Sequence, residues 1–215
     1  MVPSMDRGTF ITFEGLDGSG KTTQLRLLAD RLKQAGKEVV EAVEPGGTDI
    51  GRQIRAILLD GSNARLTPRA ELLLYFASRA QNVAEVIRPA LAARKIVLCD
   101  RFTDSTLVYQ GFGRGLGADV VTTLHEIACQ GLRPDLTVFL DIGVDESLTR
   151  ARGRNLVART SETRLDDESP DFHKAVRDAY LTLASREAHR FFVVDGTAAV
   201  EDVAQRVWKE VSHRV

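Results

Sequence analysis

The stretch from Phe10 to Thr23, FITFEGLDGSGKTT, runs from an apolar strand-like segment through a glycine-rich loop into a segment with helical periodicity. It contains the spacing GxxxxGK(S/T), in which backbone N–H groups surround phosphate oxygens and the lysine adds positive charge. A phosphate bound there lies at a helix N-terminus, which favours anions. An ordinary glycine turn is the alternative, and the strand before and the amphipathic helix after the motif argue against it. The predicted phosphate-binding residues are Gly15, Leu16, Asp17, Gly18, Ser19, Gly20, Lys21, Thr22 and Thr23.

Apolar, β-branched segments recur along the chain and alternate with helical patterns. Such alternation predicts an α/β fold in which helices cover both faces of a parallel sheet, giving three layers. The five predicted strands span residues 10–13, 39–43, 96–99, 136–140 and 191–194. With 215 residues the chain is long enough for one well-buried core and short for two full domains. We therefore expect a single domain over residues 1–215.

Capping and breaking signals set the limits of the predicted helices. Thr67 caps a long helix, and Pro89 should kink it or end it. Further helices are expected over 103–110, 118–130, 145–152, 171–185 and 200–211, and 153–170 is the least regular segment. A helix over 49–59 is expected to carry Ile50, Ile54, Ile57 and Leu58 on one face and to end before Gly61.

Composition argues against several classes of function. Lysine plus arginine (29) nearly balances aspartate plus glutamate (30), so a surface-wide attraction to nucleic acid or anionic lipid is not expected. No apolar run is long enough to span a bilayer and the first residues lack the apolar core of a signal peptide, which predicts a cytoplasmic protein. Cys99 and Cys129 are too few for a metal cluster and are predicted to be reduced packing residues. The four histidines lack ligand spacing, so surface or helix-face positions are expected.

Two of the predicted strands end in an acid, and parallel strands deliver functional groups at their carboxyl ends. Asp100 is the stronger candidate. Together with the Thr22 hydroxyl it could organise Mg²⁺ and its waters, because Mg²⁺ prefers oxygen ligands and substrate phosphates. For Asp141, a cap for the turn after the strand explains the residue as well as a functional role does.

Several arginines are candidates for phosphate contacts. Arg101 directly follows Asp100, and its planar guanidinium could grip two phosphate oxygens. Arg55 could reach a second phosphate, although a solvated position explains Arg52 and Arg55 equally well. A further group forms a local positive field that could act as a catalytic lid or be a solvated face. Its members are Arg150, Arg152, Arg154, Arg159 and Arg164, opposed within their span only by Glu162.

Five segments in order, FEGLDGSGKTTQ, EPGGT, LLLYFASRAQ, DRFTDSTLVYQGFGRG and RLDDE, resemble the thymidylate kinases of the P-loop nucleoside monophosphate kinase group. The likeness spans nearly the whole chain, and DRFTDST with YQG is far more specific than the phosphate loop. It implies a P-loop NTPase fold with a mobile lid over about residues 150–168. It also implies the reaction of ATP with dTMP, giving ADP and dTDP for dTTP synthesis, with Mg²⁺. A homodimer through the long helices is implied as well, with neither a nucleic-acid nor a membrane partner.

The resemblance assigns roles to matching positions. Lys21 and the loop amides would hold the ATP phosphates, with Thr22 close to Mg²⁺. Asp17 would contact the deoxyribose 3′-hydroxyl. Arg55 and Arg101 would clamp the dTMP phosphate, and Arg101 would also lean over the transferred group.

The same resemblance places the thymine. Phe76 would stack on the base, although from its spacing alone it is a helix core residue. Arg79 and Gln110 would hydrogen-bond the polar edge of the base, because glutamine offers both a donor and an acceptor and arginine donors suit a carbonyl oxygen. Tyr109 would lie under the sugar, where its bulk would reject a ribose 2′-hydroxyl. The remaining members of the expected dTMP site are Glu44, Ser105 and Thr106.

One departure from the family pattern concerns the lid. Some members carry a basic residue inside the phosphate loop, whereas the segment from Leu16 to Ser19 has none. The subgroup without it places arginines in the lid, as residues 150–164 do here. Since phosphoryl transfer needs positive charge on the migrating group, Arg154 and Arg164 are the expected catalytic lid residues.

Two rival functions stay open at this point. The first is a kinase for another nucleoside monophosphate or for a deoxynucleoside, which differs in the pocket set Phe76, Arg79, Tyr109 and Gln110. The second is a nucleotide-dependent switch or regulator. No NKxD guanine-reading motif occurs in the chain, which argues against a GTPase-like switch.

Overall fold

A five-stranded, all-parallel sheet forms the centre of the computed structural model, which describes residues 7–158 and 161–215. Its strand order is β2-β3-β1-β4-β5. The strands are β1 (Phe10–Glu14), β2 (Val39–Val43), β3 (Ile96–Asp100), β4 (Leu136–Asp141) and β5 (Phe191–Asp195). The five predicted strands are confirmed. All but β2 run one residue further than expected, and in each the added residue is an acid at the carboxyl end.

β1 lies in the middle of the sheet, and all of its residues are buried. Its almost continuous apolar sequence fits a strand that is covered on both faces. It pairs with β3 on one side and with β4 on the other, so that Phe13 lies beside Asp100 and Val138. The loop after Glu14 therefore emerges at the carboxyl edge of the sheet, between the ends of two neighbouring strands.

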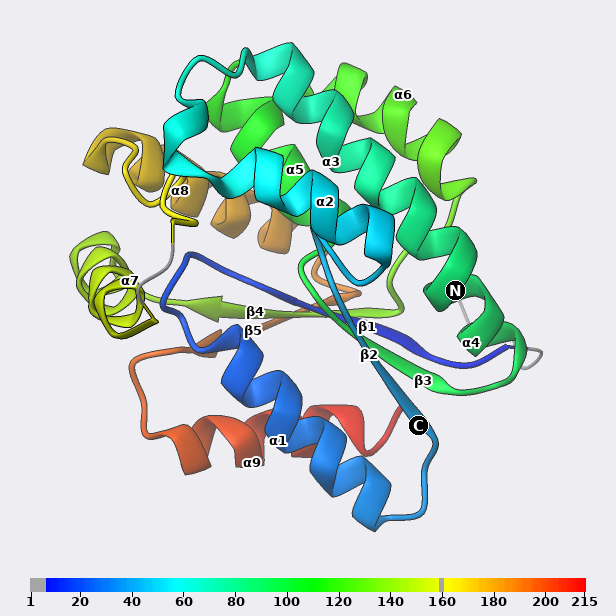
Figure 1. Cartoon of the computed structure of the whole chain (residues 1–215). Helices are drawn as coiled ribbons and strands as arrows, with labels where there is room; N and C mark the ends of the chain where they lie inside the picture. Colours follow the sequence, from blue (N-terminus) through cyan, green and yellow to red (C-terminus); the bar gives the residue numbers. More distant parts are fainter. Residues whose placement is uncertain (1–6, 159–160) are drawn as a thin grey trace.

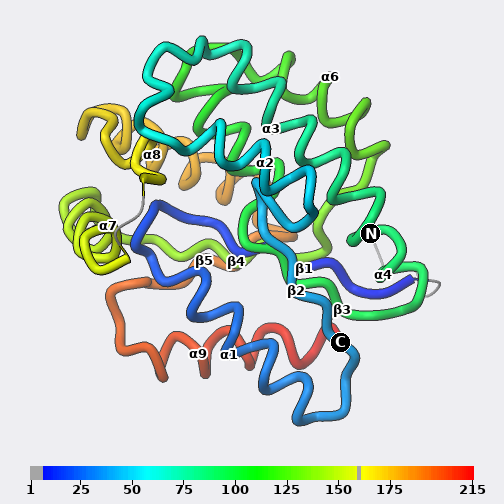
Figure 2. Tube along the Cα trace, in the orientation of Figure 1, coloured from blue at the N-terminus to red at the C-terminus, as the bar shows by residue number. Residues whose placement is uncertain are grey.

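Helices cover both faces of the sheet, which confirms the three-layer fold (Figures 1 and 2). On one face, α1 (Lys21–Gln34) and α9 (Val200–Val211) pack Leu28, Leu32 and Val207 onto the strands. The other helices cover the second face or lie beyond the carboxyl ends of the strands, as α7 does (Figure 1). They are α2 (Asp49–Leu59), η1 (Gly61–Asn63), α3 (Pro68–Asn82), η2 (Val83–Ile87), α4 (Arg88–Ala92), α5 (Thr103–Thr106), η3 (Leu107–Gly113), α6 (Ala118–Cys129), α7 (Val144–Ala158) and α8 (Pro170–Arg186).

α2 has the predicted limits, and only part of its apolar face is buried. The Thr48 hydroxyl caps its first turn by accepting a hydrogen bond from the Gly51 N–H (2.9 Å). Leu58 is fully buried, whereas Ile50 and Ile57 are 49% and 46% exposed. The reason is that α2 lies outside the sheet layer and packs mainly against α3, which covers only one narrow stripe of it.

The long helix after Thr67 changes its winding before Pro89. α3 ends at Asn82, a π-helical turn forms η2, and Pro89 lies in the first turn of α4. Proline lacks an N–H donor and its ring crowds the carbonyl four residues earlier, which a wider turn relieves. Pro89 therefore interrupts the α-helical pattern without ending the helical path, as the kink prediction allowed.

α7 is longer than predicted. It extends from Val144 to Ala158, so residues 153–158 are helical rather than irregular. The segment after Gly153 contains no proline, and one glycine inside a helix is tolerated. The lid predicted over residues 150–168 is therefore the end of a helix followed by a short connection to α8.

Two of the histidines lie on buried helix faces, His125 on α6 and His173 on α8, which the prediction of surface or helix-face positions allowed. They are 3% and 1% exposed, and burial lowers the pKa of both imidazoles. His125 Nδ1 lies 2.9 Å from the Thr103 hydroxyl. Cys99 and Cys129 are buried and free, as expected of packing residues. Among the described residues, no helix has the length and apolar character that a bilayer crossing needs.

Candidate functional site

The phosphate loop lies at the carboxyl edge of β1, and α1 begins directly after it. Gly15, Gly18 and Gly20 all have positive φ angles (142°, 76° and 95°). A Cβ atom on Gly18 would lie 2.8 Å from the Arg150 Cβ, so only glycine lets the loop pass this close to α7. No acidic residue occupies the first turn of α1, which leaves the helix N-terminus open to an anion.

Lys21 lies inside this loop and is held by its backbone. The Nζ atom donates to the carbonyl oxygens of Leu16 (2.7 Å) and Gly15 (3.2 Å). Burial, with the nearby positive charge of Arg101, lowers the Lys21 pKa to about 8, although Asp17 and Asp100 oppose the shift. An incoming phosphate would supply the anionic partner that the ammonium lacks here, and would favour its charged form.

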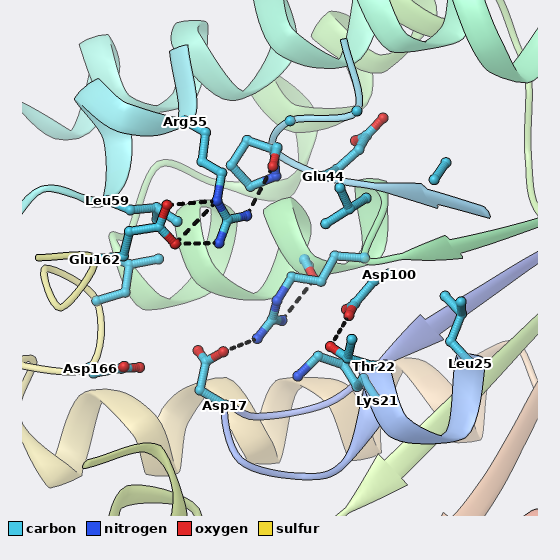
Figure 3. A pocket seen from close by; sticks show the side chains of 18 of the residues that line it. Asp17, Lys21, Thr22, Leu25, Glu44, Arg55, Leu59, Asp100, Glu162 and Asp166 are labelled. Atoms are coloured by element: carbon cyan, nitrogen blue, oxygen red, sulfur yellow. Dashed lines mark hydrogen bonds and ion pairs between the residues drawn. The ribbon is translucent and has the colours of Figure 1, made fainter. Parts of the chain in front are cut away.

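Thr22 and Asp100 meet at the same edge. The Thr22 hydroxyl donates to the Asp100 carboxylate (2.5 Å), which lies at the end of β3 (Figure 3). Two hard oxygen donors beside a phosphate loop fit Mg²⁺, which takes few protein ligands and completes its shell with water and substrate phosphates.

Arg101 lies between the phosphate loop and the helix that follows β3. Its Nη2 donates to the Asp17 carboxylate (3.0 Å), and its Nη1 donates to the Ser105 hydroxyl (3.1 Å). The guanidinium also lies over the Tyr109 ring, 5.1 Å from its centroid. Arg101 has a φ angle of 69°, in the left-handed region that residues with side chains rarely adopt. The site therefore holds this side chain in an unfavourable backbone conformation.

Asp17 is the acid inside the loop. Burial alone would raise its pKa, but the charges of Arg101 and Lys21 outweigh burial and hold the pKa well below its usual range. Its backbone carbonyl accepts a hydrogen bond from the Ser147 hydroxyl (2.6 Å), which connects the loop to α7. Asp17 is therefore an anionic acceptor at neutral pH.

A buried ion pair closes the other end of the cavity. Arg79 donates through Nε to Glu44 and through Nη2 to the Thr106 hydroxyl (3.0 Å), and Asn82 also donates to Glu44 (3.2 Å). Arg79 is 1% exposed, and its Nη1 atom has no hydrogen-bond partner among the described residues. An unpaired buried donor is unfavourable, so a ligand acceptor at this point would be stabilising.

The two adjacent aromatic residues of α3, Tyr75 and Phe76, differ in whether they line the cavity. Phe76 packs in a core cluster with Leu72 and Val121 and does not line the cavity, whereas its neighbour Tyr75 does. Tyr109 and Gln110 also line the cavity. Gln110 is 1% exposed, and its amide nitrogen donates to Glu71 (2.7 Å), which leaves its carbonyl oxygen as an acceptor.

Arg55 is paired with a carboxylate of the segment after α7. Its Nη2 and Nε donate to Glu162 (2.6 and 3.0 Å), and its Nη1 donates to the Pro45 carbonyl (3.0 Å), as Figure 3 shows. The segment is anchored to the end of α2 by backbone contacts, from Gly61 N–H to the Ser161 carbonyl (3.0 Å) among others. A phosphate that bound Arg55 would have to take the place of the Glu162 carboxylate.

The two arginines predicted to act from the lid lie in different places. Arg154 lines the cavity, is half exposed and donates to Asp166 (3.1 Å). Arg164 is buried on the far side of the segment, where it donates to Glu71 (2.6 Å) and to the Leu58 carbonyl, and it does not line the cavity. Arg150 lines the cavity as well. Arg159 lies outside the described residues.

Two residues of the site, Glu14 and Tyr180, escaped the sequence reasoning, and a third, Asp141, has a partner that the sequence did not indicate. Glu14, the last residue of β1, is fully buried and accepts hydrogen bonds from Ser105 and Tyr180. As an acid at the end of a strand, it carries the same signal that singled out Asp100. Tyr180 is contributed by α8 and has no local sequence signal. Asp141 forms a two-point ion pair with Arg177 (2.7 and 2.9 Å), which gives it a structural partner on α8.

One cavity of about 950 Å³, within the range of ligand sites, joins the phosphate loop to the arginines around it. Its lining includes Asp17, Lys21, Thr22, Arg55, Arg79, Arg101, Tyr109, Gln110 and Arg154. Figure 3 shows the loop residues Asp17, Lys21 and Thr22 on one side of the cavity, with Arg55 and Glu162 across from them. The two ends of the cavity differ in chemistry, because the loop end offers amides and cations and the far end offers Arg79 and Gln110 with aromatic rings.

A phosphate loop after the central strand, an arginine facing it and a cavity deep enough for a second ligand define a P-loop phosphotransferase of the nucleoside monophosphate kinase class. The family model described as thymidylate kinase matches residues 13–207. The chain is 53% identical to the thymidylate kinase of Geobacter sulfurreducens over 209 residues, which cover 97% of the chain and 98% of the relative. It is 52% identical to that of Pelobacter propionicus over 205 residues, covering 95% and 94%. The chain belongs to the thymidylate kinase family.

Proposed function

We propose that the chain transfers the γ-phosphoryl group of ATP to dTMP, forming ADP and dTDP for dTTP synthesis. The observation that supports this most is the cavity that joins the phosphate loop to an end lined by Arg79 and Gln110, where Arg79 Nη1 has no hydrogen-bond partner in the part of the chain that the structure describes. Membership in the thymidylate kinase family supports the same acceptor.

In the proposed complex, the ATP phosphates lie against the loop amides and Lys21. Lys21 exchanges its carbonyl contacts for phosphate oxygens. Thr22 and Asp100 would hold Mg²⁺, which supplies positive charge to the phosphate oxygens when it is bound. The protein acts by positioning and by electrostatics, and no covalent intermediate with the enzyme is needed.

The acceptor occupies the other part of the cavity. Arg79 Nη1 and Gln110 bind the polar edge of thymine, and the aromatic face comes from Tyr75, which lines the cavity, with Phe76 behind it as the alternative. Tyr109 lies under the sugar, and Asp17 accepts from the 3′-hydroxyl. Arg101 and Arg55 bind the acceptor phosphate. Glu44 and Thr106 orient Arg79, and Ser105 orients Arg101, as their hydrogen bonds indicate.

The segment from α7 to α8 serves as the lid. Arg154, which faces the cavity, is the favoured lid cation, and Arg150 lies close to the loop. Arg164 can act on phosphate only if the segment leaves Glu71. Phosphoryl transfer benefits from such a closure because it excludes water and adds positive charge.

A homodimer through α3 and α6 belongs to the same proposal. The two helices pack side by side, and both expose large apolar side chains, namely Leu73 (56%), Val120 (47%) and Ile127 (70%). Exposed apolar patches of this kind are typical of interfaces. A single domain over the whole chain, a cytoplasmic location and the lack of a nucleic-acid partner stay predictions.

Coupled measurement of ADP formation with a panel of acceptors tests the function. We expect fast turnover with dTMP, slower turnover with dUMP, and negligible turnover with AMP, CMP or deoxythymidine. A Lys21→Met preparation should lose turnover with every acceptor, which excludes a contaminating kinase. Equal turnover of AMP would refute the thymine assignment, and ATP hydrolysis without any acceptor would favour a nucleotide-dependent switch.

A further inference from the structure

Glu14 is a fully buried carboxylate directly under the phosphate loop, and its hydrogen bonds all lead toward Arg101. One oxygen, Oε2, accepts from the hydroxyls of Ser105 (2.5 Å) and Tyr180 (2.7 Å). The other oxygen, Oε1, accepts from the backbone N–H of Phe102 (2.8 Å). A carboxylate has no proton to donate, so it fixes the direction of all three donors.

The two hydroxyls connect this carboxylate to the guanidinium of Arg101. Ser105 Oγ lies 3.1 Å from Arg101 Nη1 and 2.9 Å from the Tyr180 hydroxyl, which is itself 3.5 Å from the same nitrogen. With their protons directed at Glu14, both hydroxyl oxygens present lone pairs to the arginine. The opposite side of the guanidinium is bound by Asp17. Its orientation therefore depends on Glu14 through two intermediaries.

The hydrogen bond between the Phe102 N–H and Glu14 acts on Arg101 by a second route. Arg101 has the left-handed φ angle of 69°, which is unfavourable for a residue with a side chain. Its own N–H donates to the Phe13 carbonyl (3.0 Å), and the next N–H, that of Phe102, donates to Glu14. The end of β1 thus holds the chain on both sides of the strained residue.

We propose that Glu14 is a positioning residue for phosphoryl transfer, which holds the Arg101 guanidinium toward the phosphate loop through Phe102 N–H, Ser105 and Tyr180. The inference rests on the proposed function, in which Arg101 binds the acceptor phosphate and the transferred group. It assigns to Glu14 no contact with substrate. Its effect should therefore appear in kcat and in the use of the acceptor more than in the binding of ATP.

The charge state of Glu14 gives the role a pH signature. Burial, with the negative charge of Asp104, raises the Glu14 pKa to about 7, although Arg101, Ser105 and Tyr180 oppose the shift. A proton on Glu14 removes one acceptor and releases the hydroxyls, so kcat should fall as pH drops below about 7. The ionisable groups that act on or respond to this carboxylate are Asp104 on α5, Arg101 after β3, Tyr180 on α8, Lys21 on α1, Arg79 on α3 and Cys99 on β3.

The raised Glu14 pKa also predicts how substitution of Glu14 changes stability, which separates a positioning role in catalysis from a role in folding. Because the pKa is raised in the folded state, the ionised carboxylate is unfavourable for folding at pH values above its unfolded pKa, and the penalty is fully present above about pH 7. Replacing Glu14 by the neutral glutamine removes that penalty. At pH 8 the substitution should therefore leave the unfolding temperature unchanged or raise it, while catalysis declines.

The test is Glu14→Gln in the full-length chain, with kcat and KM for both substrates measured from pH 6 to 9. We expect kcat at pH 8 to fall at least tenfold, KM for ATP to stay within twofold, and the decline below pH 7 to disappear. Thr12→Val is the matched control. It removes a buried hydroxyl two residues earlier on the same face of β1, which is bonded to Thr137 and not to the Arg101 chain, and should keep normal kinetics.

A double substitution examines the connection itself. Because Glu14 and Ser105 act on Arg101 in series, Glu14→Gln combined with Ser105→Ala should lose little more kcat than the worse single variant. If Glu14→Gln fails to fold, Tyr180→Phe takes its place. It keeps the ring stacked on Phe139 (4.9 Å) and should lower kcat three- to tenfold.

Several outcomes overturn the inference. They are kcat for Glu14→Gln within twofold of the parent at every pH, multiplicative losses in the double variant, or an unchanged kcat for Tyr180→Phe where the glutamine variant is insoluble. A parent protein without dTMP kinase activity refutes the proposed function instead, so the two failures are distinguishable.

Discussion

Two parts of the cavity hold their cations in different ways: a loop half, lined by Lys21 and Arg101, and a lid half, lined by Arg55 and Arg154. In the loop half, Lys21 is bound by backbone carbonyls and Arg101 by hydroxyls and one carboxylate, on the ends of β1 and β3. In the lid half, each arginine is paired with an acid, Arg55 with Glu162 and Arg154 with Asp166. The loop half therefore meets a phosphate with cations that are already oriented, whereas the lid half must exchange carboxylates for phosphate oxygens.

The difference between the two halves follows from the structural elements on which their cations lie. The ends of β1 and β3 are held by ladder hydrogen bonds in the centre of the sheet. The segment after α7 lies outside the sheet and is attached to the end of α2 by the bridge between Asp60 and Glu162, by backbone hydrogen bonds such as that from Gly61 N–H to the Ser161 carbonyl (3.0 Å), and by ion pairs. Positions fixed by buried strands favour electrostatic preorganisation, and weakly attached segments favour closure on substrate.

The largest effect is expected from the loop half. Arg101→Ala removes the only arginine that faces both Asp17 and the Ser105 hydroxyl in the described residues, and kcat should fall by about 10³-fold or more, as for other arginines on transferred phosphoryl groups. Steady-state kinetics with dTMP, beside thermal unfolding, measures the effect.

Arg101→Lys is the control for this substitution, because it keeps the charge but loses the two-pronged geometry. Its kcat should lie between those of the parent and the alanine variant. Near-normal turnover of Arg101→Ala would remove Arg101 from the reaction and with it the proposed difference between the halves.

The two halves also differ in how much of their structure could be predicted from the sequence. The loop half was predictable because the strand, the glycines, the lysine and the strand-end acid Asp100 are each recognisable from neighbouring residues in the sequence. Glu14 could have been found from the same pattern of strand-end acids. In the lid half, the arginine run does not encode which partner each member takes, and Glu71, the partner of Arg164, lies 93 positions away.

The aromatic pair on α3 shows a second limit. Tyr75 and Phe76 are adjacent and both aromatic, so their sequence does not say which one faces the cavity. Consecutive residues on a helix point about 100° apart, and the packing of Leu72 and Val121 around Phe76 decides the rotation. Only the tertiary contacts identify Tyr75 as the lining residue.

A medium effect should separate the two lid arginines. Arg154→Ala removes a half-exposed cation that faces the cavity, and kcat should fall by roughly 10²-fold with an unchanged unfolding temperature. Arg164→Ala instead deprives the buried Glu71 of a partner, and the free energy of unfolding should fall by about 2 kcal/mol. Paired kinetic and denaturant measurements compare the variants.

Glu71→Gln controls for Arg164, because it weakens the same buried contact from the other side and should share the stability loss. The opposite result, a large loss of kcat and normal stability for Arg164→Ala, would mean that Arg164 leaves Glu71 and acts on phosphate in the closed state.

The smallest effect is expected from substitution of Glu162, whose carboxylate forms an ion pair with Arg55. Glu162→Gln keeps the side-chain size and removes the charge with which a dTMP phosphate must compete. Partly exposed ion pairs contribute about 0.2–1 kcal/mol, so dTMP should bind up to roughly fivefold more tightly. Calorimetric titration with dTMP measures this change in affinity.

Asp167→Asn is the matched control for Glu162→Gln. It changes the net charge of the same segment equally, while the Asp167 carboxylate contacts Thr163 and not Arg55. Weaker binding by Glu162→Gln would show that Glu162 supports the acceptor site rather than competing with it, and the lid half would then be preorganised like the loop half.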